Sequence, residues 1–274
     1  MQAKIYQIFY DAPTRGLVDK AFIPLDNTAN LRPDWFEFWV ILNYLRTHAL
    51  EENTWYGFLS PKFSVKTGFN AQIVHQLLSS HDHRDVAIFS HSWDQTCYFR
   101  NPFEQGEQEH PGLLDISQKF LNAIGVQVDL ATMVCPASRT VFSNFVIAKK
   151  GYWDQWRSWA EKFWDYVENT PERDPRLQTK TSYPSDPNGL PMKTFVQERF
   201  ASVLLSTGQF SVIYPDISDR AYISKQWSTP DGTVRAHLMS CDLLKRKYLQ
   251  TGDASFLEMY YKIRSSIQSQ ANYS

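Results

Sequence analysis

The run Phe142-Ser-Asn-Phe-Val-Ile-Ala148 is followed closely by a segment with a different periodicity, residues 152–168. A short apolar run of this kind is typical of a strand that is buried on both faces. The segment after it carries an apolar stripe with helical spacing, formed by Trp153, Trp156, Ala160, Phe163, Trp164 and Val167. Such a stripe indicates an amphipathic helix that packs its aromatic side chains in the core. A strand leading into a helix is the repeating unit of an α/β domain.

The same alternation extends in both directions from this stretch. Further apolar runs with strand character are Ile5–Phe9, Tyr56–Leu59, Val86–Phe89 and Phe210–Tyr214. Helical spacing recurs over residues 34–48, 70–79, 113–124, 192–206, 235–250 and 254–268. We therefore expect an α/β fold with a central mixed sheet flanked by helices. The chain is predicted to form a single domain over residues 1–274, with an α/β core (1–215) and a C-terminal helical extension (216–274).

One segment departs from this alternation. Residues 171–191 contain five prolines and few apolar side chains, which indicates a long loop. Long loops inside compact domains are often lids or binding loops, so this segment is a candidate cover for a binding site.

The composition excludes several classes of protein. The 274 residues are enough to bury a sizeable core. With 28 Lys and Arg against 29 Asp and Glu, the chain has no overall basic field of the kind that holds nucleic acid, so no nucleic-acid partner is expected. The three cysteines show no CxxC spacing, which argues against a zinc site and a disulfide framework.

The sequence predicts a cytoplasmic location. The first ten residues alternate like a strand and lack the apolar core of a signal peptide. No apolar run approaches the roughly 20 residues that span a bilayer. Exposed Trp or Tyr side chains leave a peripheral contact with the inner face of the membrane open. The C-terminal helices are equally suited to binding a partner or only their own sheet.

Ligands of open α/β sheets bind outside the carboxyl ends of the strands, so residues directly after the apolar runs are the first candidates. Tyr10 and Asp11 follow the first run, and Lys62 and Lys66 follow the second. Two lysines on a loop at a strand end suit a phosphate, although they are also compatible with a solvated basic loop. Neither GxxxxGK[ST] nor GxGxxG is present, which excludes a P-loop and a dinucleotide-binding fingerprint.

The third run is followed by Ser90, His91 and Asp94. A carboxylate at this position can hold a divalent metal or act as a general base, and histidine titrates near neutral pH. The alternative is that Asp94 caps the following helix, with Trp93 packed beneath it.

A polar stretch over residues 101–112 contains three carboxylates and a histidine. It is expected to be a loop, either solvated or able to bind sugar hydroxyls through Glu104 and His110. The chain has no Gly-x-Ser-x-Gly elbow, no HExxH pair and no second His near a Cys. Serine hydrolase, zincin and cysteine protease chemistry are therefore poorly supported.

Two further segments carry a family resemblance. Val141-Phe-Ser-Asn-Phe-Val-Ile-Ala-Lys149 leads into the aromatic helix, and Met192–Leu205 contains the step Glu198-Arg-Phe200. Together they resemble the second half of bacterial GT-A-type glycosyltransferases of capsule and lipopolysaccharide gene clusters. In those proteins a strand of the type Asn-x-Phe-x-x-x-Lys precedes an aromatic helix, and a Glu-Arg-Leu/Phe helix follows. Trp35-Phe-Glu-Phe-Trp39 and Trp55-Tyr-Gly-Phe-Leu-Ser60 look like the family's first half, so the resemblance covers most of residues 1–215.

The resemblance implies a GT-A-like fold, that is, a nucleotide-diphospho-sugar transferase fold. It also implies transfer of a sugar from a nucleotide-diphosphate sugar to a growing surface polysaccharide or another glycan acceptor. The donor site would comprise Tyr10, Asp11, Lys62, Lys66, Ser90 and His91, the acceptor site Glu104, His110 and Asn144, and the catalytic carboxylates Asp94 and Glu198. The family usually presents Asp-x-Asp for a divalent metal, whereas this chain has one carboxylate there, Asp94, as the candidate ligand for Mn²⁺ or Mg²⁺.

Alternatives to this interpretation remain open. Glu198 could instead pair with Arg199 or with a neighbouring helix. The whole protein could be a catalytically inactive carbohydrate-binding or scaffold protein of a polysaccharide assembly system. A third hypothesis is a hydrolase built on the carboxylates of residues 94–109.

Overall fold

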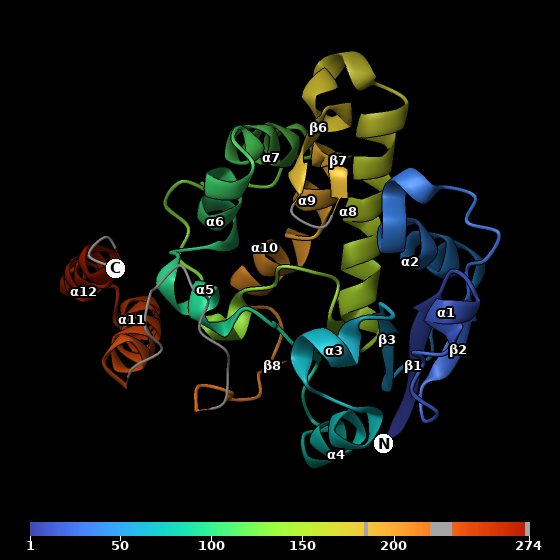
Figure 1. The fold of residues 1–274 in the computed structure, drawn as a ribbon, viewed down its shortest axis with the longest axis horizontal. Helices are drawn as coiled ribbons and strands as arrows, with labels where there is room; N and C mark the ends of the chain where they lie inside the picture. The colour runs from blue at the N-terminus through green and yellow to red at the C-terminus, as the bar shows by residue number, and fades with distance from the viewer. Residues whose placement is uncertain (184–185, 220–231, 272–274) are drawn as a thin grey trace.

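The computed structural model describes residues 1–183, 186–219 and 232–271. The fold is α/β, with a mixed six-stranded sheet flanked by helices (Figure 1). The alternation of apolar strand-like runs with segments of helical spacing predicts this class of fold. The strand order is β2-β1-β3-β5-β4-β8. β5 runs antiparallel to both of its neighbours, and the other pairs are parallel. The strands are β1 (Gln2–Phe9), β2 (Ile23–Asp26), β3 (Thr54–Leu59), β4 (Val86–Ile88), β5 (Val146–Ala148) and β8 (Val212–Ile213).

The centre of the sheet is buried on both faces. Every residue of β3 is buried, which explains why its sequence is a continuous apolar run rather than an alternating one. Gly57 allows β5 to approach closely, because a Cβ atom there would lie 2.8 Å from Cγ1 of Ile147. One hydrophobic cluster covers each face of the sheet. The predicted aromatic stripe of residues 152–168 belongs to the first cluster, in which Trp153 and Trp156 are almost fully buried.

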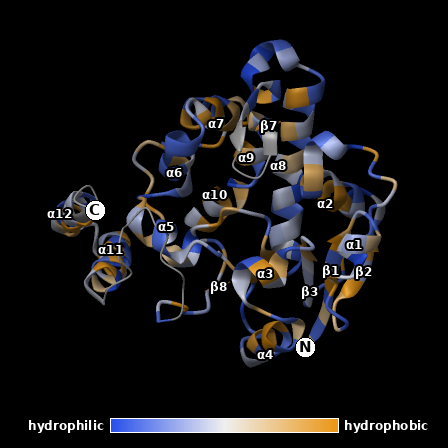
Figure 2. Cartoon of the chain, viewed as in Figure 1, coloured by the Kyte–Doolittle hydropathy of each residue, from blue (hydrophilic) through white to orange (hydrophobic). Residues whose placement is uncertain are grey.

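The helices alternate with the strands and cover both faces of the sheet. Hydrophobic and hydrophilic residues are interleaved along most of them (Figure 2), as expected where one side packs and the other is solvated. Asn70 caps the fourth helix by accepting a hydrogen bond from the Ile73 amide, as its position in the sequence predicts. The helices are α1 (Ala12–Arg15), α2 (Phe36–Thr47), α3 (Phe63–Thr67), α4 (Ala71–Ser80), α5 (Trp93–Tyr98), α6 (Pro102–Glu109), α7 (Leu113–Ala123), α8 (Lys150–Glu168), α9 (Met192–Gln197), α10 (Phe200–Ser206), α11 (Gly232–Thr251) and α12 (Ser255–Ala271).

Three segments differ from the expectation. The polar stretch 101–112 is not a loop, because Asn101 accepts hydrogen bonds from two backbone amides and starts helix α6. The long loop predicted over 171–191 contains two 3-10 turns and a hairpin of β6 (Lys180–Tyr183) and β7 (Asp186–Pro191). The helix predicted over 192–206 is interrupted at residues 198 and 199, which separate α9 from α10.

The C-terminal helices pack side by side, and α11 also packs against α5 (Figure 1). The buried ammonium of Lys245 donates hydrogen bonds to the carbonyl oxygens of Thr96, Phe99 and Cys135. The predicted extension is thereby fastened to the α/β core, although residues 220–231 at its start lie outside the described residues. Over the described residues, no helix combines the length and apolar character that crossing a membrane requires.

Candidate functional site

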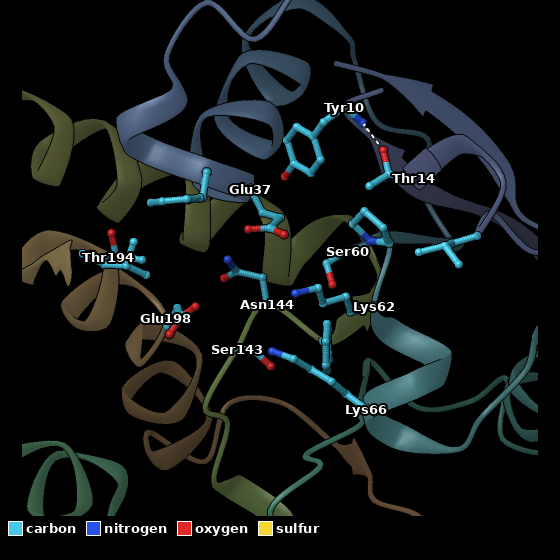
Figure 3. Close-up of a pocket in the computed structure, with 15 residues that line it drawn as sticks. Tyr10, Thr14, Glu37, Ser60, Lys62, Lys66, Ser143, Asn144, Thr194 and Glu198 are labelled. Atoms are coloured by element: carbon cyan, nitrogen blue, oxygen red, sulfur yellow. Dashed lines mark hydrogen bonds between the residues drawn. The ribbon is translucent and has the colours of Figure 1, made fainter. Parts of the chain in front are cut away.

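A pocket of about 270 Å³ opens at the carboxyl ends of the parallel strands β1 and β3 (Figure 3). Tyr10 enters it directly after β1, and Lys62 enters it just beyond β3. Asn144 reaches it from the residues that precede β5, which runs the opposite way and so begins at the same edge of the sheet. Glu37 of α2 and Glu198, just after α9, complete its wall. We call this space the first pocket.

A second pocket of about 180 Å³ adjoins the first. The two share Lys66, Ser143, Leu190, Thr194 and Glu198, so they form one groove. The second pocket extends past the end of β4 toward α6 and is also lined by His91, Ser92, Gln95, Gln105, His110, Phe142, Phe195 and Arg199.

Seven of the eleven residues predicted for the site therefore line one groove, although they come from distant parts of the sequence. They are Tyr10, Lys62, Lys66, His91, His110, Asn144 and Glu198.

The two lysines supply the positive charge of the groove. Lys62 immediately precedes α3 and Lys66 lies in its last turn, so one short helix presents both. Both side chains are exposed. The Lys66 ammonium lies 5.9 Å from the centre of the Phe145 ring. Within the described part of the chain neither lysine has an ion-pair partner, which leaves both ammonium groups free for an anionic ligand.

Glu198 has an unusual environment for a carboxylate. Desolvation by the pocket wall raises its pKa to about 7, and the charge of Glu37 adds to this effect. Arg199 and Lys66 act in the opposite direction but only partly offset it. A carboxyl group with this pKa can accept a proton at neutral pH, as a general base must.

The guanidinium of Arg199 does not bind Glu198. It donates instead to the carbonyl oxygens of Pro102 and Phe195 and to Oε1 of Gln105. Among the described residues the Glu198 carboxylate has no hydrogen-bond or ion-pair partner. The Glu198–Arg199 pairing considered as the alternative role of Glu198 is therefore not formed.

Glu37 was not predicted as a site residue. It lies in the first turn of α2, and the Tyr10 hydroxyl points toward it (Figure 3). That hydroxyl is buried, and the Glu37 carboxylate acts on it. Burial and the Glu37 charge raise the pKa of Tyr10 well above its ordinary value, so the hydroxyl stays protonated. The only sequence signal for Glu37 is a carboxylate in an otherwise aromatic helix start, Trp35-Phe-Glu-Phe-Trp39.

Both histidines of the second pocket are uncharged at neutral pH. Burial lowers the pKa of His91 and of His110 to about 4, with further contributions from Lys66 and Arg199 respectively. His110 stacks on Phe195, with ring centres 3.7 Å apart. The Nδ1 atom of His91 is buried without a hydrogen-bond partner among the described residues.

Asp94 lies outside both pockets. Its side chain is buried in the first turn of α5, next to Trp93 in the sequence. The N-cap position of α5 is Ser92, so Asp94 does not occupy the capping position considered from the sequence. Mn²⁺ and Mg²⁺ prefer several oxygen ligands. Within residues 1–183, 186–219 and 232–271, no cluster of three His, Cys, Asp or Glu side chains could hold a metal ion. Asp94, the expected metal ligand, does not lie in the groove.

Three other predicted residues have structural partners instead. The Ser90 hydroxyl donates to the Thr140 carbonyl oxygen. Glu104 accepts hydrogen bonds from the Arg100 amide and the Arg264 guanidinium, at 2.7 Å each. Asp11 is exposed and caps α1. Asp11 and Ser90 follow strands and Glu104 lies in the polar stretch 101–112, but none of the three lines the groove.

Comparisons of the chain with known protein families, with curated proteins and with solved structures found no match in any of the three.

Proposed function

We propose that the protein is a glycosyltransferase with a GT-A-like fold, which transfers a sugar from a nucleotide-diphosphate sugar to a hydroxyl group of a glycan acceptor. One observation carries the proposal: Lys62 and Lys66 share a groove at the strand ends with Glu198, a carboxyl group whose pKa is about 7. A diphosphate needs cations, and activation of a hydroxyl needs a base. The mixed sheet with flanking helices is compatible with the fold that the family resemblance implies.

In this proposal the nucleotide occupies the first pocket. Lys62 and Lys66 bind the diphosphate as point charges. Tyr10 and Glu37 lie at the other side of the same pocket. The Glu37 carboxylate can accept hydrogen bonds from N–H groups of a base or from ribose hydroxyls, and Tyr10 offers an aromatic ring and a hydroxyl donor. These contacts would select the nucleotide.

The transfer step follows from the same arrangement. The acceptor oxygen forms a bond to the anomeric carbon, and the bond from that carbon to the diphosphate oxygen breaks. The diphosphate leaves with the electron pair, and the acceptor proton moves to the Glu198 carboxylate. Lys62 and Lys66 stabilise the negative charge that develops on the leaving group.

Binding of nucleotides tests the proposal directly. We expect UDP, GDP, CDP or CMP, alone or as the nucleotide sugar, to raise the melting temperature, because a ligand selective for the folded state stabilises it. Each compound is measured with and without manganese. The variant Lys62→Ala/Lys66→Ala should bind the selected nucleotide at least tenfold more weakly. Lys247→Ala, which removes an exposed lysine of α11, should bind it normally.

Turnover then separates a transferase from a binding protein. Release of the nucleoside diphosphate should depend on a glycan acceptor and should be lost in Glu198→Gln. If no nucleotide raises the melting temperature of the folded protein, the transferase proposal is contradicted. Glycan binding without turnover would then favour the carbohydrate-binding or scaffold alternative. Release of free sugar without a nucleotide would favour a hydrolase.

The kind of acceptor determines where in the cell we expect the protein to act. A growing surface polysaccharide would be met in the cytoplasm at the inner face of the membrane, where the assembly system would provide the partner proteins. Fractionation of cells with and without that assembly system tests this part of the proposal.

A further inference from the structure

The second pocket is lined mainly by uncharged hydrogen-bonding groups. Five of these residues line the second pocket but not the first: His91, Ser92, Gln95, Gln105 and His110. Serine and glutamine side chains and a neutral imidazole can each donate and accept hydrogen bonds. This mixture matches the hydroxyl groups of a sugar, which also donate and accept.

The charged groups at this pocket are Lys66, Glu198 and Arg199. The Arg199 guanidinium is buried, and its three hydrogen bonds to protein oxygens hold it in place. Lys66 lies at the border with the first pocket, where it is needed for the diphosphate. In its ionised form, Glu198 repels a second carboxylate. The low pKa values of the two histidines keep their rings neutral, so they offer no positive charge either.

Two buried polar atoms of the second pocket lack hydrogen-bond partners within the described residues, Nδ1 of His91 and Oγ1 of Thr194. An unsatisfied buried polar group costs free energy, so such atoms in a pocket wall indicate a ligand that would satisfy them. The stacked rings of His110 and Phe195 line the same pocket. Hydrogen-bonding atoms next to a flat apolar surface suit the two kinds of surface of a sugar ring.

We propose that the second pocket is a subsite for one uncharged sugar ring and that it discriminates against uronic acids and sugar phosphates. The inference deepens the proposed glycosyltransferase function and rests on it. The ring belongs either to the donor sugar or to the acceptor. His91 was expected near the donor and His110 near the acceptor, yet both line this one pocket.

Gln95 is the residue of choice for a test. It lies on α5, is partly exposed, and has no structural hydrogen bond from its side chain among those described. Gln95→Leu removes a hydrogen-bonding group, and Gln95→Lys adds a cation that would attract a carboxylate. Gln76→Lys places the same cation on the exposed side of α4 and is the matched control. Unchanged circular dichroism and melting temperature would show that the variants fold.

The probes are UDP, UDP-glucose and UDP-glucuronic acid, or GDP, GDP-mannose and GDP-mannuronic acid if the protein selects GDP. Methyl glucoside and methyl glucuronide serve as free sugars. We expect one neutral sugar to bind at least tenfold more tightly than its uronic acid. Gln95→Lys should reduce this preference to less than threefold, and Gln76→Lys should leave it unchanged.

The variants also identify the source of the ring. If the ring belongs to the donor, Gln95→Leu weakens binding of the nucleotide sugar but not of the nucleoside diphosphate. If it belongs to the acceptor, Gln95→Leu weakens only the methyl glucoside. Equal or tighter binding of the uronic acids by the wild type, or an unchanged preference in Gln95→Lys, overturns the inference. If no nucleotide binds, the glycosyltransferase proposal fails, while the two methyl glycosides still test the subsite separately.

Discussion

Nη2 of Arg199 donates a 2.7 Å hydrogen bond to Oε1 of Gln105, on helix α6. This bond turns the guanidinium away from its neighbour in the sequence, Glu198. Successive residues of a helical turn point about 100° apart, so one residue can face the groove while the next packs in the protein. The groove thereby retains a carboxylate that has no partner among the described residues and a pKa near 7.

The first prediction concerns the pH dependence of transfer. If Glu198 accepts the acceptor proton, kcat should rise with pH and level off above about 7, because the group must be deprotonated to act. Glu198→Gln should lower kcat by on the order of 10²- to 10⁴-fold. The measurement is nucleoside diphosphate release from pH 5.5 to 9. A profile that is flat across this range, or a fully active Gln variant, would exclude Glu198 as the base.

The second prediction concerns stability at the same residue. The pKa of Glu198 is raised from 4.5 to about 7 on folding. The folded state therefore loses stability as pH rises from about 4.5 to 7, since the unfolded chain ionises first. Glu198→Gln mimics the protonated form and should stabilise the protein at pH 8 by on the order of 2–3 kcal/mol. The gain should be much smaller at pH 5. Urea unfolding at both pH values measures it, and equal gains would contradict the predicted ionisation.

The third prediction tests how Arg199 is held. A Cβ atom on Gly106 would lie 2.8 Å from Nε of Arg199 and 2.9 Å from Cδ2 of Leu113. Gly106→Ala should therefore destabilise the protein by about 1–3 kcal/mol through overpacking. The control is Gly151→Ala, where no atom lies within 4 Å of the added carbon. Because alanine favours a helix more than glycine does, Gly151→Ala should raise the free energy of unfolding by up to about 1 kcal/mol. Similar effects of the two substitutions in thermal unfolding would show that Arg199 is not packed as described.

The sequence predicts much of this fold because its signals are local. The apolar run around Val86 and the aromatic stripe that contains Trp153 follow the periods of a strand and a helix, and both are buried as expected. The errors occur where polar composition was interpreted as a loop. Asn101 starts α6 by capping it, and β6 and β7 pair as antiparallel strands although they contain several polar residues and prolines. In both segments, hydrogen bonds to the backbone stabilise regular secondary structure although the sequence has no apolar pattern there.

The site is less predictable because it depends on side-chain directions. The rule that ligands bind at strand ends selects Lys62, Lys66 and Tyr10, and these three residues line one pocket. It selects Asp94 equally well, yet that side chain is buried in α5. Glu37 joins the pocket only because α2 packs beside the end of β1, a tertiary relationship that no local pattern contains.

The fourth prediction concerns acid sensitivity. The pKa of His110 falls to about 4 on folding, so the unfolded chain binds a proton at a higher pH than the folded chain does. Stability is therefore lost as pH falls from about 6.5 to 4, by about 1–2 kcal/mol at pH 5 for this residue. Between pH 7.5 and pH 5, the His110→Gln variant should lose about 1–2 kcal/mol less stability than the wild type. This difference does not depend on what the substitution costs at pH 7.5. The exposed His83→Gln should leave the loss unchanged. Urea unfolding at the two pH values decides between these results.

The last prediction concerns the attachment of the C-terminal helices. The ammonium of Lys245 is fully buried and donates to three carbonyl oxygens, those of Thr96 at 2.6 Å and of Phe99 and Cys135 at 2.8 Å each. Burial lowers the pKa of Lys245, so part of the gain from these bonds is offset by desolvation. Lys245→Met fills similar volume but removes the ammonium donor from three carbonyl oxygens, and should cost about 2–4 kcal/mol. Among the described residues, only the carbonyl oxygen of Cys135 keeps a second donor, the Thr140 hydroxyl. Lys247→Met, two residues along α11 and exposed, should change the free energy of unfolding by less than about 0.5 kcal/mol. Urea unfolding of both variants measures the difference. A Lys245→Met variant as stable as the wild type would mean that apolar packing of α11 on α5 alone holds the extension in place.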